Sequence, residues 1–480
     1  MNKTSPERHT LTMAGLLLLV AGQLMPQMDF SIVNVALESV SISLHASKTQ
    51  LGLIVSLYGL AFAVSLALSG RLGDRYGRRR LFMLGIALFA VASFFCGLAT
   101  TIHQLIVARI AQGVAAALLM PQILATIHVS LSGTRHSQAI GIYSSVGGLS
   151  FVIGQALGGW LVSADLFGLS WRSVFYINLP VCLVILSFAR KFIPETQQDG
   201  QTVFDWNGTA LLALVITLIL TAISWGPDWQ WGWPVWLCAA AVIVLLPGLV
   251  RVEKNLAGLG KIPLLPPALL QRRTFLAGVS SLVLQVASYG GFMFVVALTL
   301  QSGFQWSSVE SGNAFIALGA TFFITSLYTE RVAKWFGRFS YSAVVLCASL
   351  INLAGYWLLF DLITARQGAL TPWDLIAPMA ITGIGNAFSV NCSVRIGLTD
   401  LPSQFAGAGS ALMTTMQQTA IALGTALAGA MYIQHLAGDD IHQLSALEAG
   451  LLVLGFMMVL QFALHAASVV RLLRAAPART

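Results

Sequence analysis

Residues 70–80 read GRLGDRYGRRR, between two long apolar runs. Glycine permits a tight turn between helices, and one acid, Asp74, stands among five arginines. Charge-assisted hydrogen bonds between this carboxylate and the arginines can hold one conformation. A loop that only carried positive charge would need neither the acid nor the glycines. We therefore predict a conformational latch made by Gly70, Gly73, Asp74, Arg75, Gly77 and Arg78.

The composition around this stretch is that of a chain dissolved in lipid. Hydrophobic residues make up 57% of the 480 residues and charged residues 9%, against about 45–50% and about 25% in soluble domains. The net charge of +8 would suggest nucleic acid for a soluble protein. Here the basic residues mark one side of a bilayer, so we expect the bilayer and no nucleic acid as a partner.

A transmembrane helix needs about 20 apolar residues, and the chain contains fourteen such stretches. We place them at residues 11–37, 49–70, 81–99, 102–127, 138–163, 173–192, 207–225, 232–250, 275–300, 309–329, 340–360, 373–394, 404–432 and 447–470.

The basic residues predict the orientation of these stretches. Of the 26 Lys and Arg, only Lys48, Arg172 and Arg366 fall between stretches on the outer side when the N-terminus is placed in the cytoplasm. Arg109 lies within a stretch, and the others fall on the inner side. Cytoplasmic loops are rich in Lys and Arg, so both termini are predicted to be cytoplasmic.

The two longest polar segments between spans follow the sixth and the eighth span and divide the chain. We expect an all-α integral membrane protein with a six-helix bundle at 1–193, a linker with two extra transmembrane helices at 194–274, and a second six-helix bundle at 275–480. Two such halves that rock about a site near the midplane are typical of secondary transporters.

Ionisable residues inside a membrane are costly and usually functional. Asp29 and Arg109 are the acid and the base that lie clearly within a span, both roughly 10–12 Å below the outer surface. A carboxyl group in a low-dielectric medium takes up a proton more readily, whereas a neighbouring arginine opposes this. We predict that Asp29 and Arg109 couple proton movement to transport. A structural ion pair that fixes helix packing is the alternative.

Several helix faces combine apolar, aromatic and amide side chains, as sites for varied apolar ligands do. Such stripes also arise from ordinary packing in a chain that is 10% aromatic, and that alternative stays open. The predicted substrate-binding residues are Met25, Asp29, Gln112, Gln285, Tyr289, Phe292, Met416 and Gln417.

Four segments carry a resemblance to a known family. GRLGDRYGRRR resembles the loop motif of the major facilitator superfamily, and LIVARIAQGVAAA at 105–117 resembles the span-four motif of its drug:proton antiporters. MDFSIVNVAL at 28–37 is similar to the span-one motif of the fourteen-span antiporters, and WRSVFYINLP at 171–180 to a segment at the start of span six. The resemblance implies the major facilitator fold, a proton role for Arg109, multidrug efflux, and a monomer in a bacterial inner (plasma) membrane.

Three positions depart from that family pattern in the first half of the chain. Glu38 stands where the span-one motif usually ends in proline. In span five the spaced glycine series keeps Gly141, Gly154, Gly158 and Gly159, but Ser150 and Gln155 stand where a glycine and a proline are missing. The remaining glycines still permit close helix packing, whereas the missing proline places strict antiport in question.

An enzyme is not expected, because neither an HExxH pair nor a phosphate-binding loop occurs. The five cysteines, scattered through apolar stretches, have no metal-ligand spacing, so we expect no metal and no cofactor. The leading hypothesis is proton-coupled export of lipophilic or cationic drugs. The alternative is transport of one metabolite, an amino acid or organic anion anchored by Arg109. A membrane sensor without transport is the third, and no signalling domain supports it.

Overall fold

The computed structural model describes residues 11–196, 205–259, 267–337, 340–366, 370–399, 406–435 and 441–474. Within these ranges the chain forms helices and turns and no strand. Eleven helical segments are long and apolar enough to cross a membrane. Three further helices, Gly133–Ala164, Ile376–Leu398 and Ala406–His435, have 32, 23 and 30 residues. The chain is an all-α, multi-pass membrane protein, as its composition predicts.

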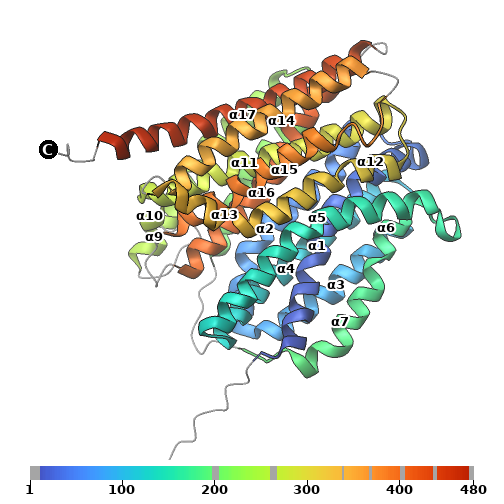
Figure 1. Cartoon of the computed structure of the whole chain (residues 1–480). Coiled ribbons are helices and arrows are strands. Elements are labelled where there is room, and N and C mark those ends of the chain that lie inside the picture. The colour runs from blue at the N-terminus through green and yellow to red at the C-terminus, as the bar shows by residue number, and fades with distance from the viewer. Residues whose placement is uncertain are drawn as a thin grey trace, which may run out of the picture.

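The first helices form an N-terminal bundle, blue to teal in Figure 1. Within it α1 packs against α5, and α4 packs against both α2 and α3. Its members are α1 (Met13–Leu44), α2 (Lys48–Tyr76), α3 (Arg78–Leu98), α4 (Ile102–Ser130), α5 (Gly133–Ala164), the short turns η1 (Leu166–Gly168) and η2 (Ser170–Arg172), α6 (Ser173–Tyr176) and α7 (Asn178–Phe192).

Polar caps set the beginnings of these long helices. The Thr12 side chain accepts a hydrogen bond from the backbone of α1, and Thr101 does the same for α4. Ser47 and Gln50 form a reciprocal capping box at the start of α2. Such caps satisfy backbone N–H groups that have no partner within the helix. We call the end of the bundle where α1 begins the inner end, and the end where α1 finishes the outer end.

Two extra helices follow the N-terminal bundle: α8 (Trp206–Ser224) and α9 (Trp233–Gly258), with the short α10 (Pro267–Leu270) after them. α8 packs against α9 and against one helix of each bundle, α2 and α16. By contrast, only 6% of the apolar window of α9 is buried. Within the hairpin, α8 therefore packs against both bundles, whereas few residues of α9 are buried.

The C-terminal bundle, yellow to red in Figure 1, contains the remaining helices. They are α11 (Arg273–Leu298), the π-helical turn η3 (Thr299–Gly303), α12 (Ser308–Ala314), α13 (Ile316–Trp335), α14 (Ser340–Arg366), α15 (Ile376–Leu398), α16 (Ala406–His435) and α17 (Ile441–Arg474). The main contacts pair α14 with α15 and α11 with α16.

The two bundles meet along α2 and α16 and along α5 with α12 and α13. Small residues allow the close approach: a Cβ on Gly59 of α2 would lie 2.9 Å from the Cβ of Ala422 of α16. At the outer end, Lys48 Nζ donates to Ser302 Oγ over 2.6 Å, and Ser302 also donates to Glu38. The outer end of the molecule is thus held together by polar contacts between the bundles.

Candidate functional site

An ion pair lies inside the N-terminal bundle. Asp29 of α1 and Arg109 of α4 pair through Oδ2 and Nη1, and both side chains have zero exposure. Water does not reach either charge, so each depends on the other and on fixed dipoles. Removing one member of such a pair costs about 3–5 kcal/mol because the other charge is left buried alone.

Local features of α1 and α2 position this pair. Pro26 lies within α1, one turn before Asp29, and proline removes a hydrogen bond of the helix and bends it. Tyr58 of α2 donates its hydroxyl to the Pro26 carbonyl over 3.0 Å. The same ring lies 4.0 Å from Arg109 Cζ, measured to the ring centroid, a distance at which a cation–π attraction operates. Tyr58 therefore links the bend of α1 to the arginine.

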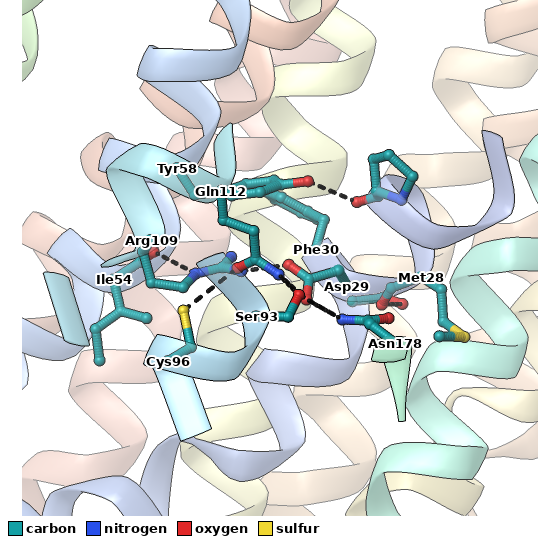
Figure 2. A network of polar contacts seen from close by, with 12 residues as sticks. Met28, Asp29, Phe30, Ile54, Tyr58, Ser93, Cys96, Arg109, Gln112 and Asn178 are labelled. Atoms are coloured by element: carbon teal, nitrogen blue, oxygen red, sulfur yellow. Dashed lines mark hydrogen bonds and ion pairs between the residues drawn. The ribbon is translucent and has the colours of Figure 1, made fainter. Parts of the chain in front are cut away.

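Gln112, one turn after Arg109 on α4, contacts both members of the pair. Its Oε1 accepts from Arg109 Nη1 over 2.7 Å, and its Nε2 donates to Asp29 Oδ1 over 2.8 Å and to Ser93 Oγ over 2.9 Å. Figure 2 shows this amide between the arginine and the carboxylate. Both ends of the amide are used, so its orientation is fixed by the charges around it.

Asn178, at the start of α7, completes the shell. Its Nδ2 donates to Asp29 Oδ1 over 3.1 Å and to Ser93 Oγ over 3.3 Å (Figure 2). Arg109 Nε in turn donates to the carbonyl of Ile54 over 3.3 Å. Four helices besides α1 thus contribute to one polar network, which we call the Asp29 network: Asp29, Ser93, Arg109, Gln112 and Asn178, with Tyr58 and the Ile54 carbonyl.

The Asp29 carboxylate is the acceptor on which this network converges. The charged carboxylate accepts from three donors, Arg109, Gln112 and Asn178. A proton cancels the attraction to Arg109, whereas the arginine keeps its hydrogen bonds to Gln112 and Ile54. The arrangement can therefore convert the presence of a proton into a weaker attachment between α1 and α4.

Three members of the network were not predicted from the sequence: Tyr58, Ser93 and Asn178. Uncharged polar residues are common in helices, and their spacing carries no sign of a buried acid nearby. Only Asn178 had a signal, because it lies in the segment WRSVFYINLP that the family shares. Ser93 and Tyr58 become visible only when the helices are packed.

The predicted substrate-binding residues divide into two groups. The first is buried: Met25 and Phe292 have zero exposure, and Asp29 and Gln112 belong to the Asp29 network. Gln285, also in this group, bonds with Asn386 and Asn352 inside the C-terminal bundle. The second, Tyr289, Met416 and Gln417, is partly exposed on α11 and α16. In this conformation the second group is the more available to a ligand.

The segment of the predicted latch, residues 70–80, is helical except at Gly77 and does not form the expected loop. α2 continues to Tyr76 and α3 begins at Arg78, so Gly77, with φ of 99°, is the one residue that breaks the helices. Asp74 pairs with Arg78 over 2.6 Å. Gly73 instead provides space, because a Cβ there would overlap the side chain of Gln122 on α4. The helix persists because an isolated glycine lowers helix stability only modestly.

The glycines predicted for helix packing on α5 contact two different partners. A Cβ on Gly154 would overlap Ser31, and one on Gly158 would lie 2.5 Å from Ile32, both on α1. A Cβ on Gly159 would overlap the backbone of Ser308 on α12. The series therefore joins α5 to α1 on one face and to the C-terminal bundle on another.

Comparison with known proteins identifies the family of this chain. The family model of the Major Facilitator Superfamily matches residues 19–425. The chain belongs to the major facilitator superfamily. The loop motif, the Asp29 network and the glycines of α5 all fall within the matched range.

Relatives in this superfamily include antibiotic exporters. The chain is 32% identical to the "Probable actinorhodin transporter" of Streptomyces coelicolor, covering 89% of this chain and 73% of that protein. It is 30% identical to the tetracenomycin C resistance and export protein of Streptomyces glaucescens, with 87% and 75% covered. It is 32% identical to the puromycin resistance protein of Streptomyces alboniger, with 86% and 80% covered.

Solved structures of other transporters share the fold. An inward-facing bacterial homologue of the human lysosomal transporter Spinster superposes with a TM-score of 0.63 at 16% identity, covering 97% of this chain and 96% of that one. An auto-inhibited peptide transporter of the POT family gives a TM-score of 0.68 at 12% identity, covering 97% and 98%. Membership and fold together indicate a transporter and not an enzyme.

Proposed function

We propose that this protein is a proton-coupled secondary transporter that exports lipophilic and cationic compounds. Three relatives at 30–32% identity are named as antibiotic transport or resistance proteins, which supports export. The proposal includes fourteen crossings of a bacterial plasma membrane, both termini in the cytoplasm, a monomer, and the division at 1–193, 194–274 and 275–480. The inner end defined above is then the cytoplasmic end.

The observation that carries the proposal is the Asp29–Arg109 pair with zero exposure. A structural ion pair could be replaced by apolar side chains with little loss of stability, so a buried pair in a membrane is a functional candidate by default. This pair is also surrounded by groups that bind the charged form of Asp29, which makes the network sensitive to one proton.

In the proposed cycle a proton binds Asp29 and releases α1 from Arg109. Gln112 stays on the arginine and compensates part of its buried charge. The N-terminal bundle can then change its contacts with the C-terminal bundle, and loss of the proton restores the pair. Each proton driven inward gains about 2.3 kcal/mol per 100 mV of membrane potential, which is enough to accumulate a compound on the outer side.

In this proposal the substrate contacts come from the residues predicted above, and Tyr289, Met416 and Gln417 contact it first because they are partly exposed. The Asp74–Arg78 pair, next to Gly77, acts as the latch of the N-terminal bundle. The metabolite alternative required Arg109 as the substrate anchor. Burial of Arg109 among Asp29, Gln112 and Tyr58 favours proton coupling over that role.

Inverted membrane vesicles test the proposal. The vesicles hold an acidic lumen, a pH-sensitive dye reports on it, and lipophilic cations are added one at a time. Proton release from the lumen with several unrelated cations, absent in vesicles with Asp29→Asn, is the expected result. No response from folded, inserted protein to any cation would contradict drug:proton antiport and direct the next experiments to organic anions.

A further inference from the structure

A groove opens at the inner end of the N-terminal bundle, away from the Asp29 network. It lies between the start of α3 and the end of α7 and has a volume of about 500 Å³. Its lining combines Arg79, Arg80 and Arg190 with the apolar side chains of Met83, Leu84 and Leu186. A volume of this size lies within the range of small-molecule sites, about 300–1,000 Å³.

The charges and the apolar groups occupy different levels of the groove. On α3 the arginines stand at the first turn, and Met83 and Leu84 follow one turn further in. On α7 the order is mirrored, because Leu186 precedes Arg190 by one turn. One helical turn is about 5.4 Å, so the basic rim lies about that far outside the apolar part.

The apolar part faces outward from the bundle. Leu84 is 50% exposed, and the neighbouring α7 residues Leu183 and Phe188 are 67% and 47% exposed. In a multi-pass membrane protein such an exposed apolar surface faces acyl chains. The groove is therefore open to lipid along its length and basic at the membrane surface.

Positive charge at the rim exceeds the negative charge beside it. Glu195 approaches Arg79 Nε at 3.6 Å and Arg80 Nε at 3.8 Å. Arg79 also donates to the carbonyls of Arg190 and Ile193 at the end of α7. Arg80 remains 76% exposed. One carboxylate thus stands against three guanidinium groups, and the exposed Arg80 side chain can exchange its long contact with Glu195 for a ligand.

We propose that this groove binds an anionic phospholipid of the inner leaflet. Its phosphate would lie among Arg79, Arg80 and Arg190, and an acyl chain would lie along Met83, Leu84 and Leu186. Guanidinium groups bind phosphate oxygens through paired, charge-assisted hydrogen bonds, and basic pockets between transmembrane helices on the cytoplasmic side suit anionic headgroups. A zwitterionic headgroup adds an ammonium group that the arginines repel.

Lipid binding here would reach the latch through Glu195. Its carboxylate accepts from the backbone N–H of Arg79 over 3.0 Å, and a Cβ on Gly77 would lie 2.7 Å from it. When a phosphate binds the side chains of Arg79 and Arg80, Glu195 loses its ion pairs with them. Its carboxylate then keeps the hydrogen bond from the backbone N–H of Arg79, next to the break between α2 and α3. The lipid would also join the ends of α3 and α7.

Native mass spectrometry of the purified full chain tests this inference without any transport assay. Phosphatidylglycerol, cardiolipin and phosphatidylethanolamine are titrated separately, and bound lipids are counted. The double variant Arg80→Gln with Arg190→Gln removes two rim charges from exposed side chains. Each interfacial arginine contributes about fivefold in affinity, so the double variant is expected to bind the anionic lipids about 30-fold more weakly.

A matched control removes two exposed basic residues elsewhere at the inner end. Arg331→Gln with Lys334→Gln on α13 should leave lipid binding unchanged, and thermal unfolding in detergent checks that both double variants are folded. Equal binding of all three lipids, retained anionic-lipid binding in the Arg80/Arg190 variant, or an equal loss in the control would overturn the proposal. Displacement of the lipid by millimolar inorganic phosphate would assign the groove to a soluble phosphate instead.

Discussion

At the scale of single residues, two of the departures from the family pattern, Glu38 and Gln155, lie where the bundles meet. Glu38 accepts a hydrogen bond from Lys48 over 3.2 Å and another from Ser302 of the C-terminal bundle. Gln155 lies on α5 opposite Gly312 of α12, whose Cβ would lie 2.5 Å from the Gln155 carbonyl oxygen. Without proline at position 155, α5 continues unbroken. Glu38 therefore adds a side-chain contact between the bundles at the outer end, whereas Gln155 meets α12 through its backbone.

Asn178→Ala should change the pH dependence of transport. The change removes one of the three donors that hold the Asp29 carboxylate, so the proposed proton site loses a partner. The pH of half-maximal transport is expected to differ from that of the parent, with transport itself retained. Rates measured in vesicles across pH 6–9 test this.

The matched control is Asn391→Ala, since Asn391 bonds with Ser326 and Thr329 in the C-terminal bundle. The control should keep the parental pH profile. A parental profile for Asn178→Ala would show that Asn178 has no influence on the proton site.

Glu38→Gln should loosen the outer end. The Glu38–Lys48 pair is partly exposed, with 28% and 31% of the side chains accessible, so its contribution is about 0–1 kcal/mol. We expect the fraction of molecules with an open outer end to rise by up to about fivefold. Spin-label distances between α1 and α12 at that end report the fraction.

Asp165→Asn serves as the comparison. Asp165 lies at the same end, but its carboxylate accepts a hydrogen bond from the backbone of Ser170, within the N-terminal bundle. Its distance distribution should match the parent. The same distribution for Glu38→Gln and the parent would rule out a closing role for Glu38.

At the scale of helices, the α8–α9 hairpin spans both bundles. Asp228, in the turn between its helices, accepts from Thr49 of α2 over 3.4 Å, and Trp231 donates to Gln434 of α16 over 3.1 Å. Along its length α8 packs Leu212, Ile216 and Leu220 with Leu60 and Ala422, from one helix of each bundle. The inserted pair therefore covers the α2–α16 junction.

Leu220→Ala should lower stability more than Val244→Ala. Leu220 of α8 is 2% exposed, whereas Val244 of α9 is 74% exposed. Truncation of a buried leucine leaves a cavity and costs about 2–5 kcal/mol, while lipid or detergent fills the space at Val244. Thermal unfolding of the two purified variants compares them, and equal losses would contradict the packing of α8 on the bundles.

The hairpin helices were predictable from the sequence to within one residue at three of their four ends, and α9 continues eight residues beyond its expected end. The expected spans 207–225 and 232–250 correspond to Trp206–Ser224 and Trp233–Gly258, because hydropathy alone defines such segments. The stretch at 70–80 was less predictable. Its glycines favour a turn, yet backbone hydrogen bonding keeps α2 helical to Tyr76, and only the positive φ of Gly77 requires glycine.

At the scale of the whole molecule, the two bundles have different polar interiors. The N-terminal bundle holds the charged Asp29 and Arg109. Between α11 and α15 of the C-terminal bundle lie uncharged amides, Gln285 and Asn386, with Asn352 of α14 beside them. These amides carry no charge that changes with pH, and the proposal therefore assigns proton coupling to the buried ion pair of the N-terminal bundle.

The sequence predicted the two charged members of the site, Asp29 and Arg109, but not the uncharged residues that surround them. Asp29 and Arg109 stood out because an ion within a span is costly wherever its helix packs. Gln112 was selected as a substrate residue, but the structure places its amide on the ion pair. An uncharged side chain can face lipid, a neighbour or a ligand at similar cost, and the packing of α3, α4 and α7 decides among these.

Proton release on drug binding measures the central claim directly. The purified protein is placed in a weakly buffered detergent solution with a pH dye, and a lipophilic cation is added. Since binding of the cation and of the proton are reciprocally linked, the account predicts that the cation releases protons from molecules in which Asp29 is protonated, and that the Asp29→Asn variant releases none. Equal proton release from the parent and from an Asp29→Asn variant that still binds the cation would contradict proton coupling at Asp29.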